Sequence, residues 1–488
     1  MIKKISTAML AALLLLQTTA CGDKTPAGTA ETTGTTAADT DTVETEPETT
    51  PLQAMGEADF GGKTFTILDA NDLPNMHVNI PGEELTGDPI NDALYNRDLI
   101  VSEKYNVEID YVQEAGFITS FKNSVVAGDT AYNSIISRGL GDNMAALANQ
   151  GILYNLNEIS SGEDANWNKP WWSGYMYDAM QLGGKFFFTT GDYAAAVYQA
   201  PACVFFNVDL GLDYSIQASD LYAQVRELTW TYESLFSMTK GMNQDLNGDN
   251  AYRHEDDFAG ILIHKDYDQL NGMMVSCGVP MSRINEEGHL VVDLLNDKTI
   301  SILEMLHQLY EPMYTYDHVD NTTQIAFPER RGLFLIHKVE NATAALRDMD
   351  DDFAVLPLPK YDETQEHYYS LISGWVFCMV GMPKTLEDPA FNGFVTEAIA
   401  RAAYELVRPA AFETTLKGKT ARDEESVAML DLIFSTLYMD FNCMYNFGNV
   451  SSKMTDWMVA GEGFASGYAA LEKPIAAAIE KVEKAYLD

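Results

Sequence analysis

Strand and helix patterns alternate in the first folded part of the sequence, and this alternation limits the folds open to the chain. The run Lys63–Leu68 is β-branched and apolar, as expected of a strand. Apolar residues then recur at helical spacing over Pro89–Tyr105, before a second strand pattern at Val107–Val112. A third strand pattern, Ser134–Ser137, precedes another helical stretch. These βαβ units predict an α/β fold whose mostly parallel sheet is covered by helices.

The chain is long and strongly acidic. Its 488 residues suffice for about two to four domains. It carries 72 Asp and Glu against 31 Lys and Arg, a net charge of -41, so a nucleic-acid backbone would be repelled. We therefore expect no nucleic-acid partner. The five cysteines lack the spacing of a zinc site or a disulfide scaffold.

Residues 1–21 have the features of an export signal. Lys3 and Lys4 precede the apolar run Ala8–Leu16, which is too short to cross a bilayer of about 30 Å. The run leads to Thr-Thr-Ala-Cys21-Gly, which resembles a bacterial lipobox and predicts a lipoprotein acylated, for example with palmitate, at Cys21. An ordinary secretory signal cleaved before Cys21 is the alternative.

Residues 22–57 are rich in Thr, Ala, Glu and Pro and contain few large apolar side chains. Such a segment cannot bury enough apolar surface to offset its conformational entropy. It predicts a disordered tether between a lipid anchor and the folded part.

Three later segments have the pattern of crossings between lobes. Two are extended runs of small residues, 191–206 and 368–382, and the third is a helical pattern over 388–407 that Pro409 is expected to end. Three crossings predict two discontinuous lobes with a cleft between them. The predicted N-terminal lobe is 58–196 plus 369–407, and the C-terminal lobe is 197–368 plus 408–488.

Several motifs resemble those of clostridial-type extracellular solute-binding proteins, over nearly the whole chain beyond the tether. They are Thr86-Gly-Asp-Pro-Ile-Asn-Asp92, Pro170-Trp-Trp172, Gly184-Lys-Phe186, Gly191-Asp192, Pro357-Leu-Pro-Lys360, Leu416-Lys-Gly-Lys419, Asp423-Glu-Glu-Ser426 and Met429-Leu-Asp-Leu432. The resemblance implies a periplasmic-binding-protein-like fold with two discontinuous α/β lobes around a hinged ligand cleft. It also implies a lipid-anchored receptor of an ABC importer, in a group that mostly binds sugars or oligosaccharides.

Motifs for catalysis are absent from the sequence. It contains no Gly-x-Ser-x-Gly elbow, no His-Glu-x-x-His and no Walker loop. Paired carboxylates carry no information among 72 acidic residues. We therefore expect a protein that is not an enzyme and needs no catalytic cofactor, with a surface glycosidase as the less favoured alternative.

The segment 245–256 has oxygen-bearing side chains at its positions 1, 3, 5 and 12, the spacing of a wrapped Ca²⁺ loop. The predicted ligands are Asp245, Asn247, Asp249, the carbonyl of Ala251, and Asp256. Such an ion would be structural. A polar turn that binds no ion is the alternative.

Loops at the carboxyl ends of strands line the ligand crevice in open α/β sheets. The sequence places three loops there, at 69–72, 139–143 and 337–341. The predicted ligand-binding residues in these loops are Asp69, Asn71, Gly141, Asp142, Asn143 and His337. Gly141 would let the backbone approach a ligand, whereas Asp142 or Asn143 has the alternative role of a helix N-cap.

Aromatic residues near the predicted crossings are candidates for stacking on sugar rings. Tyr193, Tyr198 and Trp375 lie in or beside these segments, and Asp192 would accept hydrogen bonds from hydroxyl groups. A role in the core is the alternative for each aromatic residue.

These patterns predict a monomeric receptor held by its lipid anchor at the extracellular face of the cell membrane. Its partners would be a small solute, with a sugar favoured, and the permease subunits of an ABC transporter. The solute would bridge both lobes and shift an open-to-closed equilibrium. A surface protein that captures glycans without a transporter is the alternative.

Overall fold

A computed structural model describes residues 49–488 apart from 70–78, 115, 140–142, 160–166, 251–252, 254–255, 264–266, 311–322, 373–378 and 416–423. The export signal, Cys21 and the tether residues up to 48 lie outside the described residues.

The described chain is packed against the fold well before residue 57. Leu52 is buried beside the 3₁₀ helix η1 (Gln53–Met55). Its N–H donates to the Glu405 carboxylate (2.6 Å), and its carbonyl accepts from Lys104 Nζ (2.8 Å). One buried leucine with both backbone groups bonded is enough to order this end, although composition alone assigned it to the tether.

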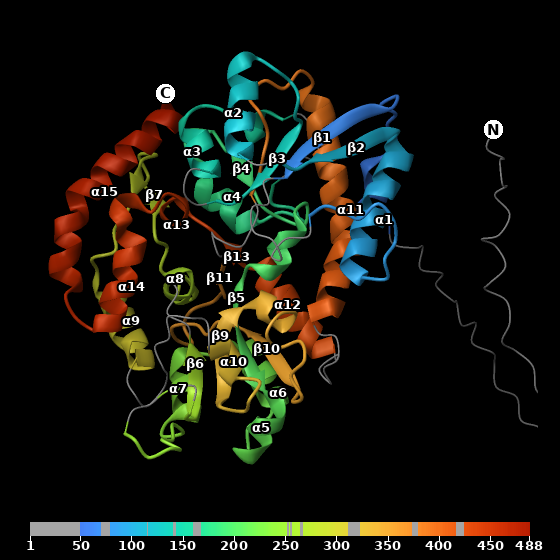
Figure 1. Cartoon of the computed structure of the whole chain (residues 1–488). Coiled ribbons are helices and arrows are strands. Elements are labelled where there is room, and N and C mark those ends of the chain that lie inside the picture. Colours follow the sequence, from blue (N-terminus) through green and yellow to red (C-terminus); the bar gives the residue numbers. More distant parts are fainter. Residues whose placement is uncertain are drawn as a thin grey trace, which may run out of the picture. The chain divides into compact units, whose positions relative to one another are not determined.

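The N-terminal lobe is built on a five-stranded sheet in the order β2-β1-β3-β12-β4 (Figure 1). Its strands are β1 (Lys63–Asp69), β2 (Val107–Val112), β3 (Ser134–Ser137), β4 (Phe188–Thr189) and β12 (Met379–Gly381). β1 is parallel to both β2 and β3, whereas β12 is antiparallel to β3 and β4. The predicted parallel pairing therefore holds for the βαβ part, and the antiparallel strand comes from the later crossing.

The helices of this lobe are α1 (Pro89–Tyr105), α2 (Phe117–Ala127), α3 (Met144–Asn149) and α4 (Gly174–Met180), with the 3₁₀ helix η2 (Leu156–Glu158). Local sequence sets the ends of α1. The Asp88 side chain accepts from the N–H groups of Ile90 and Asn91, Pro89 occupies the first turn, and Asn106 ends the helix in the left-handed conformation.

The C-terminal lobe is built on a four-stranded sheet in the order β10-β5-β9-β6. Its strands are β5 (Ala202–Asn207), β6 (Ala259–Ile263), β9 (Gly332–Lys338) and β10 (Phe353–Pro357). β5 is antiparallel to β9 and β10, and β6 is parallel to β9. Every residue of these strands is buried, so they form the centre of the lobe.

The remaining elements of this lobe surround the sheet. They are α5 (Val208–Asp213), α6 (Ala218–Arg226), α7 (Tyr232–Thr239), α8 (Tyr267–Ser276), α9 (Asp297–His307), α10 (Thr323–Ala326), α12 (Glu424–Ser435), η3 (Ala195–Gln199), η4 (Gln308–Tyr310), η5 (Val339–Ala342) and the hairpin β7 (Arg283–Ile284) with β8 (Leu290–Val291). Helices α5, α6 and α12 contact β10, and α8 and α10 contact β9.

The chain passes between the two sheets in the segments expected to cross. One passage joins β4 to β5 through η3, and a second runs from β11 (Ser370–Leu371) to β12. β11 pairs in parallel with β13 (Leu437–Tyr438), which follows α12.

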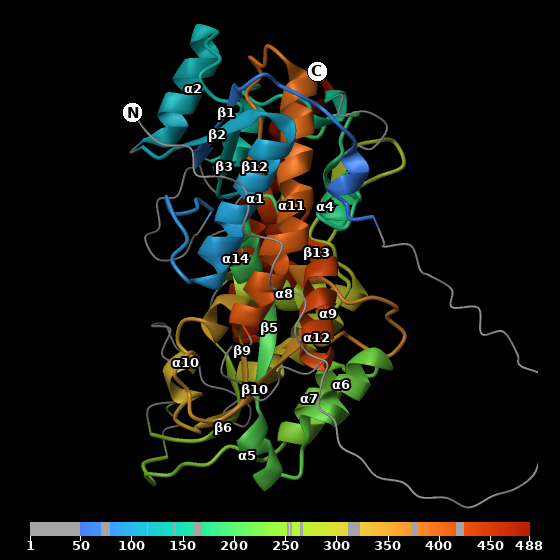
Figure 2. The same ribbon diagram turned by 90° about the vertical axis from the view of Figure 1, so that its right-hand side faces the viewer.

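The third crossing is α11 (Pro389–Thr415), which packs on α1 and then reaches the level of α12 (Figure 2). It continues through Pro409, where the sequence pattern predicted that it would end. Beyond the proline, Phe412 stacks on Phe434 of α12 with ring centroids 5.3 Å apart. This packing outweighs the cost of a proline inside the helix.

The C-terminal part consists of α13 (Phe441–Tyr445), η6 (Phe447–Asn449), α14 (Val450–Ala460) and α15 (Phe464–Leu487). α14 contacts α8 and α9, whereas the end of α15 returns to the N-terminal lobe, where Tyr486 lies against Phe187. Among the described residues, no helix has the length and apolar character needed to span a membrane.

Candidate ligand-binding site

The carboxyl ends of strands from both sheets approach the segment that crosses from β4 to β5. β1 ends at Asp69 and β9 ends at Lys338, directly after His337. η3, on the crossing segment, contacts η5, which follows β9. The strand ends of the two lobes therefore meet the same segment, as expected for the ligand crevice of an α/β fold.

Asp69 is the predicted site residue that the N-terminal lobe places most clearly at a strand end. It is buried, at 2% exposure, and pairs with Ile136 of the neighbouring strand β3. Its charge acts on Tyr193, whose hydroxyl lies 2.7 Å from Ser134 Oγ. Burial is the main reason that the pKa of Tyr193 is raised, and the Asp69 charge raises it further. The structure thus brings Asp69 and Tyr193 to one place.

His337 is the corresponding residue of the C-terminal lobe, and the geometry indicates its tautomer. The N–H of Lys338 donates to His337 Nδ1 at 2.9 Å, and the Asn341 amide lies against the same nitrogen. Because Nδ1 accepts, a neutral ring carries its proton on Nε2. The buried imidazole therefore presents an N–H donor on its other side.

Asp192 and Tyr198 are brought together, but each is engaged by protein groups. The Tyr198 hydroxyl donates to Asp192 Oδ1. Arg408 of α11 donates to both carboxylate oxygens of Asp192, at 3.0 and 2.8 Å. Burial raises the pKa of Asp192, while the Arg408 guanidinium opposes the rise. These contacts are with protein groups and position Asp192 and Tyr198 at the crossing, while contact with a ligand stays a prediction for both residues.

A second buried carboxylate fixes the loop that precedes α4. Glu397 of α11 accepts from the indole N–H groups of Trp171 (2.9 Å) and Trp172 (2.8 Å) and from Arg401 Nε (2.8 Å). The loop passes so close to Gly191 that a Cβ there would lie 2.1 Å from the Trp171 carbonyl oxygen. Only glycine fits this approach. Sequence reasoning did not identify Glu397, Arg401 or Arg408.

The structure says little about the other predicted site residues. Asn143 lies at the N-cap position of α3, where its side chain makes no capping bond. Asn71, Gly141, Asp142 and Trp375 lie outside the described residues.

The predicted calcium loop is held by hydrogen bonds within itself. The Asp245 carboxylate accepts from the N–H groups of Gly248 (2.6 Å) and Asn250 (2.8 Å). Asn250 has a positive φ of 61°, as the sixth position of such a loop requires. Asp249 pairs with Arg253 at 2.6 Å.

The oxygen set of this loop is only partly described. Asn247 Nδ2 donates to Asp256 Oδ2 at 3.2 Å, and Ala251 lies outside the described residues. Within the described part of the chain, no group of three or more acidic, His or Cys side chains has the arrangement of a metal site. The backbone conformation fits a calcium loop, whereas the Asp249–Arg253 pair would have to open for the carboxylate to reach an ion.

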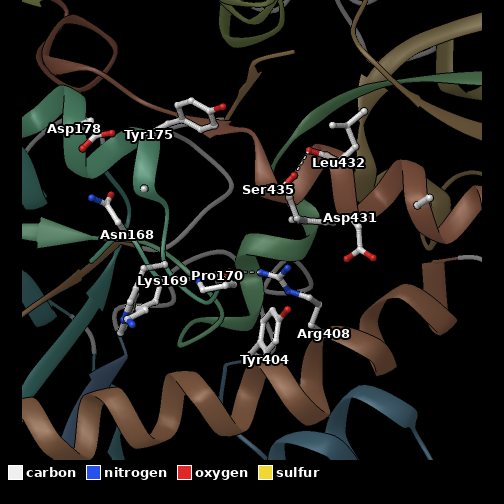
Figure 3. A pocket seen from close by; sticks show the side chains of 14 residues that line it. Asn168, Lys169, Pro170, Tyr175, Asp178, Tyr404, Arg408, Asp431, Leu432 and Ser435 are labelled. Carbon is white, nitrogen blue, oxygen red and sulfur yellow. Dashed lines mark hydrogen bonds between the residues drawn. The ribbon is translucent and has the colours of Figure 1, made fainter. Parts of the chain in front are cut away.

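A large groove lies beside Tyr404 and Arg408 of α11 (Figure 3). Its volume is about 720 Å³. The N-terminal lobe contributes the loop 168–172 and α4, and the C-terminal lobe contributes α12, while Tyr404 and Arg408 come from α11.

Comparison with known proteins finds similarity in structure alone. No model of a protein family matches the chain, and no curated protein does. A cyclo/maltodextrin-binding protein complexed with maltotetraose aligns over 88% of this chain and 97% of its own, with 12% identity and a TM-score of 0.54. UspC of M. tuberculosis aligns over 85% of this chain and 100% of its own, with 13% identity and a TM-score of 0.54.

The chain has a periplasmic-binding-protein-like fold. The expected α/β class with two lobes is thereby confirmed. The strand ends around Asp69 and His337 are the candidate ligand cleft, and the groove beside Arg408 is lined by other residues.

Proposed function

We propose that this protein is a solute receptor of an ABC importer, of the clostridial type, which captures a small carbohydrate by closing its lobes. Its membrane anchor would be lipid on Cys21. One observation carries the proposal: buried polar side chains of both lobes, Asp69 and His337, lie at strand ends that meet one crossing segment. The structural similarity to a maltodextrin-binding protein supports a carbohydrate as the ligand class.

The two polar groups have complementary hydrogen-bonding characters. The Asp69 carboxylate is an acceptor, and the His337 Nε2–H is a donor. A sugar hydroxyl both donates and accepts, so a carbohydrate can bond to either group. Only a ligand that binds the closed state more tightly can drive closure. No catalytic step is proposed.

The proposal is tested with the full chain and a panel from glucose to maltotetraose, together with peptides and polyamines. We expect a saccharide to raise the melting temperature and to reduce the radius of gyration in small-angle scattering. Asp69→Asn should weaken saccharide binding at least tenfold, about 1.4 kcal/mol. The matched control is Asp220→Asn on the exposed face of α6, which should bind like the wild type.

Trp375, which lies outside the described residues, provides an independent test. If it stacks on the sugar, Trp375→Ala should lose affinity by at least tenfold with a nearly unchanged melting temperature. Binding of peptides or polyamines with no saccharide response would contradict the proposed ligand. Saccharide binding without a change in scattering would favour a glycan-capturing surface protein, and release of a chromogenic aglycone would favour a glycosidase.

A further inference from the structure

The groove of Figure 3 joins surfaces of both lobes. Lys169 and Tyr175 belong to the N-terminal lobe, Asp431 to α12, and Tyr404 to α11. The volume of about 720 Å³ lies within the range of roughly 300–1,000 Å³ that is usual for small-molecule sites.

The floor of the groove is held rigidly by buried contacts. Arg408 donates to the Pro170 carbonyl at 3.0 Å and to the Asp192 carboxylate, so its charge is already neutralised. Its guanidinium also lies over the Tyr404 ring, 4.6 Å from the centroid. Because these groups are fixed before any ligand arrives, binding would require little ordering of the floor.

The walls carry charged groups. Lys169, Asp178 and Asp431 all line the groove, and the Arg408 charge acts on Asp431. Asp178 and Asp431 are exposed, and Lys169 is half-buried. Half-buried tyrosine rings, Tyr175 and Tyr404, lie between them. Aromatic faces beside carboxylate acceptors and an ammonium donor suit a neutral ligand with many hydroxyl groups.

The groove has its own lining residues, and Asp69, His337 and Tyr193 are not among them. The crossing segment touches the groove through Asp192, which bonds Arg408, and through Tyr193, which stacks on Trp172 with ring centroids 6.4 Å apart. The Tyr193 hydroxyl also bonds Ser134 of β3, so the segment contacts both the groove and the strand ends of the N-terminal lobe.

We propose that this groove is a second binding site for a polyhydroxylated ligand such as a short oligosaccharide. This proposal takes only the class of ligand from the proposed function. The residues of the groove differ from those of the cleft. Asp431 and Tyr175 would contact the ligand from opposite lobes, and Lys169 would donate to a hydroxyl.

The test is isothermal titration of the full chain with maltotetraose and the other saccharides of the panel. Two binding events are expected. Asp431→Ala and Tyr175→Ala should each weaken binding in the groove at least tenfold and leave binding in the cleft unchanged. Asp69→Asn should weaken binding in the cleft and leave binding in the groove unchanged. Ser435→Tyr should fill the groove and remove the same event as Asp431→Ala. The matched control is Glu413→Gln, an exposed carboxylate of α11 outside the groove.

The outcomes separate the groove from the cleft. If every saccharide binds the folded groove variants as it binds the wild type, the groove proposal is overturned and the cleft proposal stands. If Asp431→Ala loses saccharide binding while Asp69→Asn binds like the wild type, the groove proposal is supported and the cleft proposal is contradicted. If no saccharide binds the wild type at millimolar concentration, both proposals fail. Melting temperatures of all variants establish that they are folded.

Discussion

At the scale of single residues, the Asp192–Arg408 pair best shows how this molecule positions its site. The carboxylate is 1% exposed, lies at the start of the crossing segment, and bonds a helix that begins on the N-terminal lobe and ends near the other. Tyr198, further along the crossing, donates to the same carboxylate. One ionised group thus holds three segments, and its neutralisation depends on Arg408.

We expect Arg408→Met to destabilise the protein by about 3–5 kcal/mol, because it leaves a buried carboxylate without its cation. Burial would then raise the pKa of Asp192 further, with the Tyr198 hydrogen bond left to oppose it. A carboxyl with a raised folded-state pKa binds a proton more tightly when folded, so stability of the variant rises as pH falls through that range. The measurement is urea unfolding at pH 7 and pH 4.5.

The loss relative to the wild type should be smaller at pH 4.5 than at pH 7. Arg408→Met with Asp192→Asn removes both charges and serves as the control, with a loss that should depend little on pH. An equal loss for Arg408→Met at both pH values would contradict the electrostatic account.

How far the sequence predicts the site depends on whether a residue is positioned locally. Asp69 and His337 lie at the ends of recognisable strands, which extend one to two residues into the loops that the sequence predicted, so the strand-end rule placed them in the fold. Asp192 and Arg408 are 216 positions apart, and Trp171 and Glu397 are 226 apart. Nothing local marks such partners, so Asp192 was predicted as a ligand contact and neither Arg408 nor Glu397 was identified.

At the scale of elements, α11 shows why the predicted boundary at Pro409 was wrong. Proline removes one backbone hydrogen bond and crowds the preceding turn. The helix nevertheless runs to Thr415, since its first half packs on α1 and Phe412 packs on Phe434 and Tyr198. Local propensity predicted the elements around β1 well, because caps and periodicity agree there. It did not predict the end of α11, because tertiary contacts determine where that helix ends.

The calcium loop is a testable element. Ca²⁺ should raise the melting temperature of the chelator-treated protein, and Asp249→Asn should abolish that rise. Without calcium the variant should melt near the wild type, because the Asp249–Arg253 pair is half-exposed and contributes little. Glu233→Gln on α7 is the control. An equal melting temperature for wild type with calcium or chelator would identify the segment as an ordinary polar turn.

The last helix, α15, should be required for stability through its final turn. Tyr486 is buried against Phe187 and Phe441, with ring centroids 4.8 and 5.2 Å away. Tyr486→Ala should cost about 3–5 kcal/mol, since it removes a buried ring. Tyr486→Phe keeps the ring and loses only the bond to the Tyr445 hydroxyl, so about 1 kcal/mol is expected. Equal losses in urea unfolding would show that packing is not the cause.

At the scale of the whole molecule, the two lobes could be predicted from the sequence, but the packing of α15 on the N-terminal lobe could not. The alternating patterns and the three crossings indicated two lobes. The return of α15 to the N-terminal lobe is invisible in the sequence, because its apolar face is compatible with either lobe. The start of the fold was also missed, because composition does not show that Leu52 is bonded to distant helices.

Anchoring is tested on the intact cell. Cys21→Ala should release the protein into the medium or leave its precursor unprocessed, because the acyl chains that would hold it are lost. A fatty-acid probe should label the wild type and fail to label the variant. An unlabelled wild type would indicate an ordinary secretory signal, and Cys203→Ala serves as the control because that thiol is buried.

The attachment of Leu52 has a mechanical consequence under this anchoring. Leu52 is bonded to Glu405 and Lys104, on the two helices α11 and α1 that pack together beside the N-terminal sheet. Thirty residues separate Cys21 from this point, and a chain of that length reaches at most about 100 Å when fully extended. Any pull from the membrane would enter the folded part at α1 and α11, beside the N-terminal sheet. The second lobe has no direct attachment to the tether in this arrangement. Tension in the tether would therefore not act directly against closure of the lobes.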